Sequence, residues 1–167
     1  HILLKGECDP TISVGGILPA IGGNIRVGQS ETFLTEACEY TNSFLSFFPT
    51  LGIILNMDAD HLDFFKDIDD IRHSFRKFAE LLPADGALII NADTPKYEMV
   101  AENLPCKVIT YGLEHDAEYT ASDITYDEFG HPTFHVLHNR YLFPESTGHP
   151  QRIQCPRFHR SRQTSWS

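Results

Sequence analysis

Three carboxylates and a histidine lie within six residues of one another, shortly after a short apolar run. The apolar run is residues 51–55, and the polar residues are Asp58, Asp60, His61 and Asp63. A short apolar run bounded by turn-forming residues predicts a buried strand. In open α/β sheets, ligands bind outside the carboxyl ends of the strands. The sequence therefore places hard oxygen ligands and one imidazole where an α/β protein would bind a ligand or a metal.

A second predicted strand also ends in a carboxylate. Residues 32–35 form a short strand-like run, and Glu36 follows them directly. We expect the two strands to be neighbours, so that Glu36 and His61 can share one cation. Oxygen ligands with few imidazoles favour Mg²⁺ or Mn²⁺ over zinc. The alternative is that Asp58 and Asp60 are turn or helix-capping residues and that His61 is an ordinary surface histidine.

The composition limits the classes of protein. The chain has 167 residues, enough for one domain, and a net charge of −10, which argues against nucleic acid or an anionic membrane as a partner. No apolar run approaches the ~20 residues of a membrane span, and we see no signal peptide. The four cysteines are scattered without C-x-x-C spacing, which favours reduced thiols and a cytoplasmic location.

Two pairs of glycines follow the first predicted strand, residues 11–14. They are Gly15 with Gly16, and Gly22 with Gly23. Paired glycines let the backbone approach a phosphate group closely. The alternative is that both pairs form ordinary turns.

The remaining pattern alternates between strands and helices, which is typical of an α/β fold with a mostly parallel sheet flanked by helices. An antiparallel hairpin around Gly130 is expected at the edge of that sheet. The strongest helical pattern is at residues 68–82, where an apolar residue recurs on every helical turn. The expected elements are helices at 1–5, 68–82 and 97–104, and strands at 11–14, 32–35, 51–55, 87–90, 107–111, 119–126 and 133–138.

These residues, in this order, resemble the Mur ligase family. The resemblance covers residues 1–138 and rests on five segments and the elements that follow them. The segment at residues 36–45 begins with Glu-Ala-Cys-Glu-Tyr, where the family more commonly has Glu-Ala-Asp-Glu-Ser. The two differ at Cys38 and Tyr40. The segments are 9–16, 23–28, 36–45, 56–63 and 91–93.

The resemblance implies an enzyme of peptidoglycan precursor synthesis that uses ATP and Mg²⁺. ATP would phosphorylate the carboxyl group of UDP-N-acetylmuramate, and the amino group of L-alanine would attack the acyl phosphate to give an amide, ADP and phosphate. Glu36 and His61 would hold Mg²⁺ against the phosphates. Asn24, Arg26 and Ser43 would lie near the UDP-sugar. The resemblance assigns no catalytic residue here.

Three alternatives remain open at this point. One is a sibling ATP-dependent amide ligase that joins a different amino acid. Another is a metal-dependent hydrolase built on the carboxylates around His61, with His73 as the nearest additional ligand. The third is a fragment without enzymatic activity, which binds Mg²⁺ weakly or misfolds.

We interpret residues 1–139 as a partial central ATP-binding domain of a Mur ligase. The family's phosphate-binding loop, G-T-x-G-K-T/S, is expected upstream of His1, because no G-x-x-x-x-G-K occurs in the chain. The family's UDP-binding and C-terminal domains are also expected outside this chain. The chain alone is therefore predicted not to turn over ATP.

The composition changes abruptly at Arg140. Residues 1–139 carry eight Lys and Arg against 22 Asp and Glu, whereas residues 140–167 carry five Arg against one Glu. The second segment has no helix or strand period, which predicts an irregular, disordered tail. Read one base later, the codons for residues 147–157 permit P-G-x-H-N-x-x-N-A-L-A, a segment that Mur ligases carry at this point. We interpret residues 140–167 as an out-of-frame translation; the alternative is a genuine divergent tail, such as a basic arm.

Overall fold

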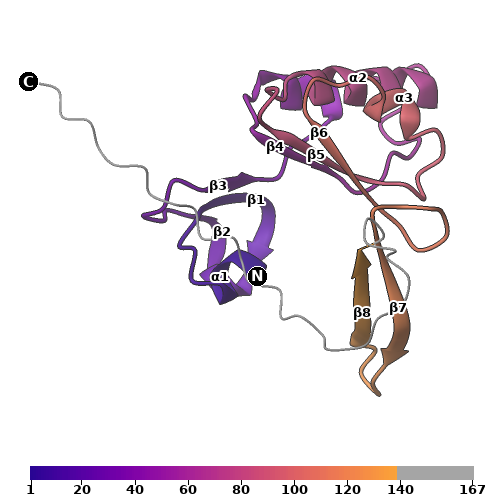
Figure 1. Ribbon diagram of the computed structural model, residues 1–167. Helices are drawn as coiled ribbons and strands as arrows, with labels where there is room; N and C mark the ends of the chain where they lie inside the picture. Colours follow the sequence, from indigo (N-terminus) through magenta and orange to yellow (C-terminus); the bar gives the residue numbers. More distant parts are fainter. Residues whose placement is uncertain (139–167) are drawn as a thin grey trace, which may run out of the picture.

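A computed structural model of the chain describes residues 1–138, and these residues form two separate sheets (Figure 1). The smaller sheet has the strand order β2-β1-β3, and the larger has the order β4-β5-β6-β7-β8. The predicted tail, 140–167, lies outside the described residues. No helix within residues 1–138 is long and apolar enough to cross a membrane.

The smaller sheet is built from the first 35 residues. Helix α1 (Ile2–Lys5) leads into β1 (Thr11–Leu18), which pairs antiparallel with β2 (Gly23–Arg26) and parallel with β3 (Phe33–Thr35). Strand β1 is longer than predicted and includes Gly15 and Gly16, so the first glycine pair does not form a turn. Gly22 does lie in a turn, with a φ of 71° that favours glycine.

The larger sheet confirms the predicted mostly parallel arrangement with an antiparallel edge hairpin. Strands β4 (Leu51–Ile54), β5 (Ala87–Asn91) and β6 (Lys107–Tyr111) are parallel, and Ile53, Ile89 and Ile109 lie side by side across them. Strand β7 (Tyr119–Tyr126) joins β6 in parallel, and β8 (Pro132–His138) pairs antiparallel with β7. The β7–β8 hairpin extends away from the helix-covered part of the sheet (Figure 1).

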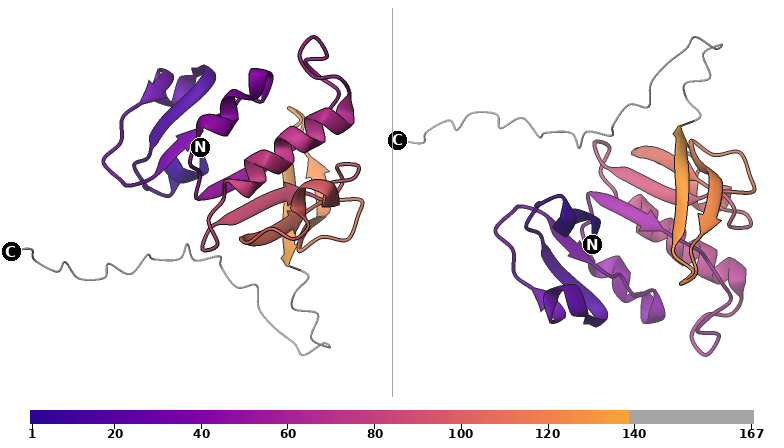
Figure 2. Two further views of the ribbon diagram at one scale, coloured as in Figure 1. Left: turned by 90° about the horizontal axis from the view of Figure 1, so that it is seen from above. Right: turned by 90° about the horizontal axis from the view of Figure 1, so that it is seen from below.

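Two helices cover one face of β4, β5 and β6 (Figures 1 and 2). Helix α2 (Ile68–Glu80) begins after Asp67, whose side chain accepts a hydrogen bond from the Asp70 N–H at 2.9 Å. Helix α3 (Glu98–Ala101) is shorter than the predicted helix. The apolar residues buried between helices and sheet form the core: Phe44, Ile54, Met57, Phe78, Ala79, Leu82, Leu88, Ile90, Val100, Ala101 and Cys106.

The opposite face of the larger sheet is open at β4. Leu51 and Ile53 point to that face and are 54% and 51% exposed, whereas Gly52 and Ile54 face the helices and are buried. Parallel sheets are normally covered on both faces. In the described part of the chain, this edge of the sheet is covered on one face only.

The expectation that the strands preceding Glu36 and His61 are neighbours is wrong. Strand β3 pairs with β1 in the smaller sheet, and β4 pairs with β5 in the larger one. The segment between them contains the 3-10 helical stretch η2 (Tyr40–Ser46), which packs against α2. This segment carries the chain from one sheet to the other.

Candidate functional site

His61 lies in the loop that connects β4 to α2. Its φ is 53°, its N–H donates to Asp60 Oδ1 at 2.8 Å, and its carbonyl accepts the N–H groups of Phe64 and Phe65, both at 2.9 Å. Phe65 is buried and anchors this turn in the protein. Asp60 therefore has the turn role that the alternative interpretation gave it, while the His61 side chain remains partly exposed at the surface.

The residues next to the His61 ring come from the segment after β3. The ring centroids of Tyr40 and His61 are 4.7 Å apart, and Glu39 Oε1 lies 3.5 Å from His61 Nε2. The Tyr40 hydroxyl donates to Asp63 Oδ2 at 2.8 Å, and this hydrogen bond raises the pKa of Tyr40. The two segments that follow β3 and β4 therefore meet, although the two strands belong to different sheets.

The 3-10 stretch that begins at Tyr40 is fixed to helix α2 by a buried aromatic ring and a hydrogen bond. Four residues later, Phe44 is 2% exposed and stacks on Phe78 of α2, with a centroid distance of 4.9 Å. Asn42 accepts a hydrogen bond from the Ser74 hydroxyl of α2. Thr41 and Asn42 have positive φ values of 55° and 59°, which kink the 3-10 stretch between Tyr40 and Phe44.

Glu36 directly follows β3 and is exposed. Its Oε2 accepts the backbone N–H of Gly15 at 2.7 Å, and its own N–H donates to the Ser13 carbonyl at 2.9 Å. A Cβ on Gly15 would lie 3.2 Å from Glu36 Oε2, so the glycine leaves room for the carboxylate beside β1. Gly15 thus holds the Glu36 carboxylate beside β1, whereas nothing lies within 4 Å of a Cβ at Gly16.

The donor set fits part of a Mg²⁺ shell. Within residues 1–138, no group of three or more His, Cys, Asp or Glu side chains is arranged to hold a metal by itself. Mg²⁺ commonly takes only one or two protein ligands and completes its shell with water and phosphate oxygens. Glu36 and His61 have the donor chemistry for such a partial shell, but the carboxylate beside His61 is that of Glu39, whereas Glu36 is bonded to Gly15.

The residue set of the hydrolase alternative is not assembled. His73 lies on α2 with its Nδ1 2.7 Å from the Asp69 carbonyl oxygen. Asp63 accepts a hydrogen bond from the Tyr40 hydroxyl, and Asp60 accepts one from the backbone N–H of His61. The described residues therefore give this alternative no multi-ligand centre.

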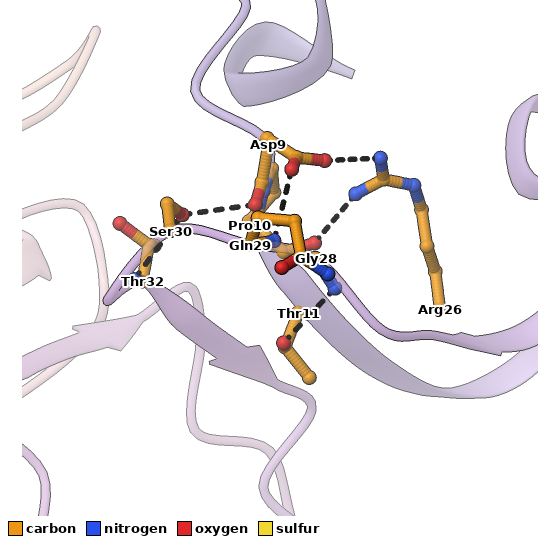
Figure 3. A network of polar contacts seen from close by, with 8 residues as sticks. All are labelled: Asp9, Pro10, Thr11, Arg26, Gly28, Gln29, Ser30 and Thr32. Atoms are coloured by element: carbon orange, nitrogen blue, oxygen red, sulfur yellow. Dashed lines mark hydrogen bonds and ion pairs between the residues drawn. The ribbon is translucent and has the colours of Figure 1, made fainter.

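Arg26, one of the expected substrate-binding residues, is held in an internal network (Figure 3). Its Nη1 donates to the Pro10 carbonyl at 2.8 Å, and its Nη2 pairs with Asp9 Oδ1. The hydrogen bond from Arg26 lowers the pKa of Asp9. Asn24 lies two residues earlier on β2, on the same face of the strand, and is exposed.

Asp9 organises the turn that follows β2, a role that sequence reasoning missed. Its Oδ2 accepts the Gln29 N–H at 2.9 Å, and its carbonyl accepts the Ser30 hydroxyl at 2.9 Å. Thr11 Oγ1 accepts the Gly28 N–H at 3.1 Å (Figure 3). The available signal was the segment that begins at Asp9, which contributed to the family resemblance.

Ser43, the third expected substrate-binding residue, has local hydrogen-bond partners. Its hydroxyl donates to the carbonyl oxygens of Cys38 and Tyr40, at 3.0 Å in each case. Ser43 therefore stabilises the bend that presents Tyr40.

A second polar cluster forms where β5 and β6 end. Asp93 accepts the backbone N–H groups of Leu113, Glu114 and His115 at 2.6–3.0 Å, which lowers its pKa to about 2. A cavity of about 280 Å³ adjoins it. Asn91, Tyr111, Tyr119 and Phe134 are among the residues that line this cavity.

Comparison with known sequences decides the family. The family described as Mur ligase middle domain matches residues 18–144. The chain belongs to the Mur ligase family. It is 61% identical over 140 residues to the UDP-N-acetylmuramate–L-alanine ligase of Lachnospira eligens, a match that covers 83% of the chain and 30% of that relative. This Mur ligase chain thus spans about a third of the length of that curated relative.

Solved Mur ligases share the fold. A UDP-N-acetylmuramate:L-alanyl-γ-D-glutamyl-meso-diaminopimelate ligase from Neisseria meningitides superposes with a TM-score of 0.68 at 22% identity, covering 83% of this chain and 46% of that one. A UDP-N-acetylmuramate–alanine ligase from Thermotoga maritima gives a TM-score of 0.61 at 23% identity, covering 75% and 27%.

Proposed function

We propose that this chain is part of an ATP-dependent ligase that joins L-alanine to UDP-N-acetylmuramate in peptidoglycan precursor synthesis. The observation that carries the proposal is the 61% identity to the Lachnospira eligens enzyme of that name. The reaction proceeds through an acyl phosphate of the muramoyl carboxyl group, and the amine of L-alanine displaces phosphate. The enzyme acts in the cytoplasm and needs no nucleic acid or membrane partner.

Glu36 and His61 are the proposed Mg²⁺ ligands. The ion supplies charge neutralisation for the phosphoryl group in transfer. The support is the donor chemistry of the two residues and the meeting of the segments that follow β3 and β4. The hydrogen bond from Gly15 to one oxygen of Glu36 fixes the carboxylate, which would limit the entropy lost on metal binding.

Asn24, Arg26 and Ser43 are the proposed residues near the UDP-sugar. Asn24 is the best placed of the three for direct contact because it is exposed. Arg26 and Ser43 would act through the backbone that they hold, because both already have partners within the protein.

We also propose that residues 1–139 are a partial central ATP-binding domain and that residues 140–167 are translated out of frame. Sequencing the coding DNA through the codons for residues 136–162 tests this directly. A one-base change that restores P-G-x-H-N-x-x-N-A-L-A with an open frame beyond it supports the proposal. Independent reads that confirm the printed frame overturn it.

A chimeric enzyme tests the proposed function. Residues 1–138 replace the corresponding segment of the Lachnospira eligens ligase, and phosphate release is measured with ATP, Mg²⁺, UDP-N-acetylmuramate and L-alanine. We expect activity that requires all four components. The 167-residue chain alone is expected to release no phosphate, because its sequence lacks a phosphate-binding loop.

Two variants of the chimera test the metal residues. Glu36→Gln keeps an oxygen for the Gly15 N–H but loses the charge, and His61→Ala loses the imidazole. We expect each to lower the apparent Mg²⁺ affinity by roughly 10- to 100-fold. Glu98→Gln and His135→Ala are matched controls at exposed sites. If the metal dependence of the four variants is the same, Glu36 and His61 are not the ligands.

A further inference from the structure

We propose that Tyr40 is a positioning residue that holds the His61 imidazole in the orientation needed to bind a divalent cation. The inference rests on the proposed function, since it takes His61 to be a metal ligand. It assigns a role to a side chain at which this chain departs from the commoner family motif.

The geometry that supports this role is a two-point contact. The Tyr40 ring lies against the His61 ring at a centroid distance of 4.7 Å and an interplanar angle of 35°. The Tyr40 hydroxyl donates to Asp63 Oδ2 at 2.8 Å, two residues beyond His61. The ring therefore restricts the imidazole itself, while the hydroxyl fixes the loop that carries it.

A further side chain, Glu39, contacts the imidazole itself. Glu39 Oε1 lies 3.5 Å from Nε2, so a carboxylate stands at one ring nitrogen. Phe64 packs edge-on against the Tyr40 ring, at a centroid distance of 6.0 Å. Metal-binding imidazoles commonly have their second nitrogen beside a carboxylate, which sets the ring orientation. In this arrangement Nδ1 is the nitrogen left for a cation.

Tyr40 can impose this orientation because its own position is fixed. Phe44, buried in the core, and Asn42, bonded to Ser74, attach the 3-10 stretch to α2. His61, by contrast, belongs to an exposed loop with a positive φ. Without Tyr40, few contacts would restrict rotation of the imidazole about its side-chain bonds.

The test uses the 167-residue chain and Mn²⁺, whose paramagnetism broadens NMR signals of nearby nuclei. In the unaltered chain we expect Mn²⁺ to broaden the His61 ring signals at lower concentration than those of His73 and His115. We also expect nuclear Overhauser contacts between the Tyr40 and His61 rings. Tyr40→Leu should lose these contacts and require at least about tenfold more Mn²⁺ for the same broadening.

Tyr40→Phe keeps the ring and removes only the hydroxyl, so it should retain most of the Mn²⁺ response. Tyr126→Phe, at an exposed site on the hairpin, is the matched control and should respond like the unaltered chain. Circular dichroism establishes that each variant is folded.

The outcomes separate the two proposals. If His61 responds selectively to Mn²⁺ and Tyr40→Leu binds equally well, the positioning role is overturned and the proposed metal site stands. If His61 in the unaltered chain responds no more than His73 and His115, both are overturned. Absence of ring contacts in the unaltered chain overturns the positioning role even if Tyr40→Leu does not fold.

Discussion

The guanidinium of Arg26 bridges the carboxylate of Asp9 and the carbonyl oxygen of Pro10, and so ties β2 to the segment that directly precedes β1. Such a bridge needs two donors in a fixed planar arrangement, which arginine supplies and lysine does not. Arg26, which was expected to lie near the substrate, therefore stabilises the smaller sheet through these contacts.

Arg26→Lys should lower the midpoint of urea unfolding, because a single ammonium cannot satisfy both acceptors in the same geometry. Asn24→Ala, on the same face of the same strand, is the control and should change the free energy of unfolding by no more than about 0.5 kcal/mol. Equal stability of the two variants would mean that the bridge contributes nothing. In the chimeric enzyme, Asn24→Ala should instead raise the Michaelis constant for the UDP-sugar.

Gly28→Ala should destabilise the chain by roughly 3 kcal/mol. A Cβ at this position would lie 2.1 Å from the Asp9 carbonyl oxygen and 2.4 Å from the Pro10 carbonyl carbon, so the backbone would have to move. Gly16→Ala is the matched control, because nothing lies within 4 Å of a Cβ there. Chemical denaturation of both variants measures the difference, and a fully stable Gly28→Ala would contradict this packing.

Phe44→Ala should cost about 3–5 kcal/mol of unfolding free energy. Its ring fills the core between η2 and α2, stacking on Phe78 and meeting Phe75 edge-on at 5.4 Å. Phe48→Ala removes the same atoms from a side chain that is 93% exposed, and should change stability by less than about 0.5 kcal/mol. Similar losses for the two variants would show that Phe44 does not join η2 to the helix.

Acid should weaken the fold through Asp93. Its pKa falls from 3.8 to about 2 on folding because backbone N–H groups stabilise the carboxylate. The stabilisation is fully present above about pH 4 and is lost as the pH falls toward about 2. Asp93→Asn should flatten the loss of stability over this range, measured by thermal unfolding at successive pH values. Asp85→Asn is the control, and if it flattens the profile equally the assignment to Asp93 is wrong.

Local patterns predicted most of the larger sheet. The apolar pattern of the sequence predicted the strands at 87–90 and 107–111 and the helix at 68–82. All three elements lie within two residues of their predicted bounds. The helix expected at 97–104 ended early because Glu102 is extended, with a ψ of 143°, and Asn103 has a positive φ. Periodicity carries no information about such backbone angles.

Strand partnership and long-range polar contacts were not predictable in the same way. The pairing of β3 with β1 is made by backbone groups, which every sequence shares. Asp9 and Arg26 are 17 residues apart, and nothing in their spacing marks them as partners. At the candidate site, residue type and position predicted Glu36 and His61 as metal ligands, which stays a prediction. The contact of Tyr40 with His61 required the kink at Thr41 and Asn42, which residue type does not indicate.

The order of strands in each sheet also has a consequence for how the chain folds. Within residues 1–138, every strand of the larger sheet pairs with its neighbour in sequence, and the smaller sheet is made only from residues 11–35. No strand pairing in this part of the chain links the two sheets. Each sheet closes only chain segments within its own part of the sequence, the longest being residues 55–86 between β4 and β5. The two sheets can therefore form independently and in either order, with the docking of Phe44 onto α2 as the step that joins them.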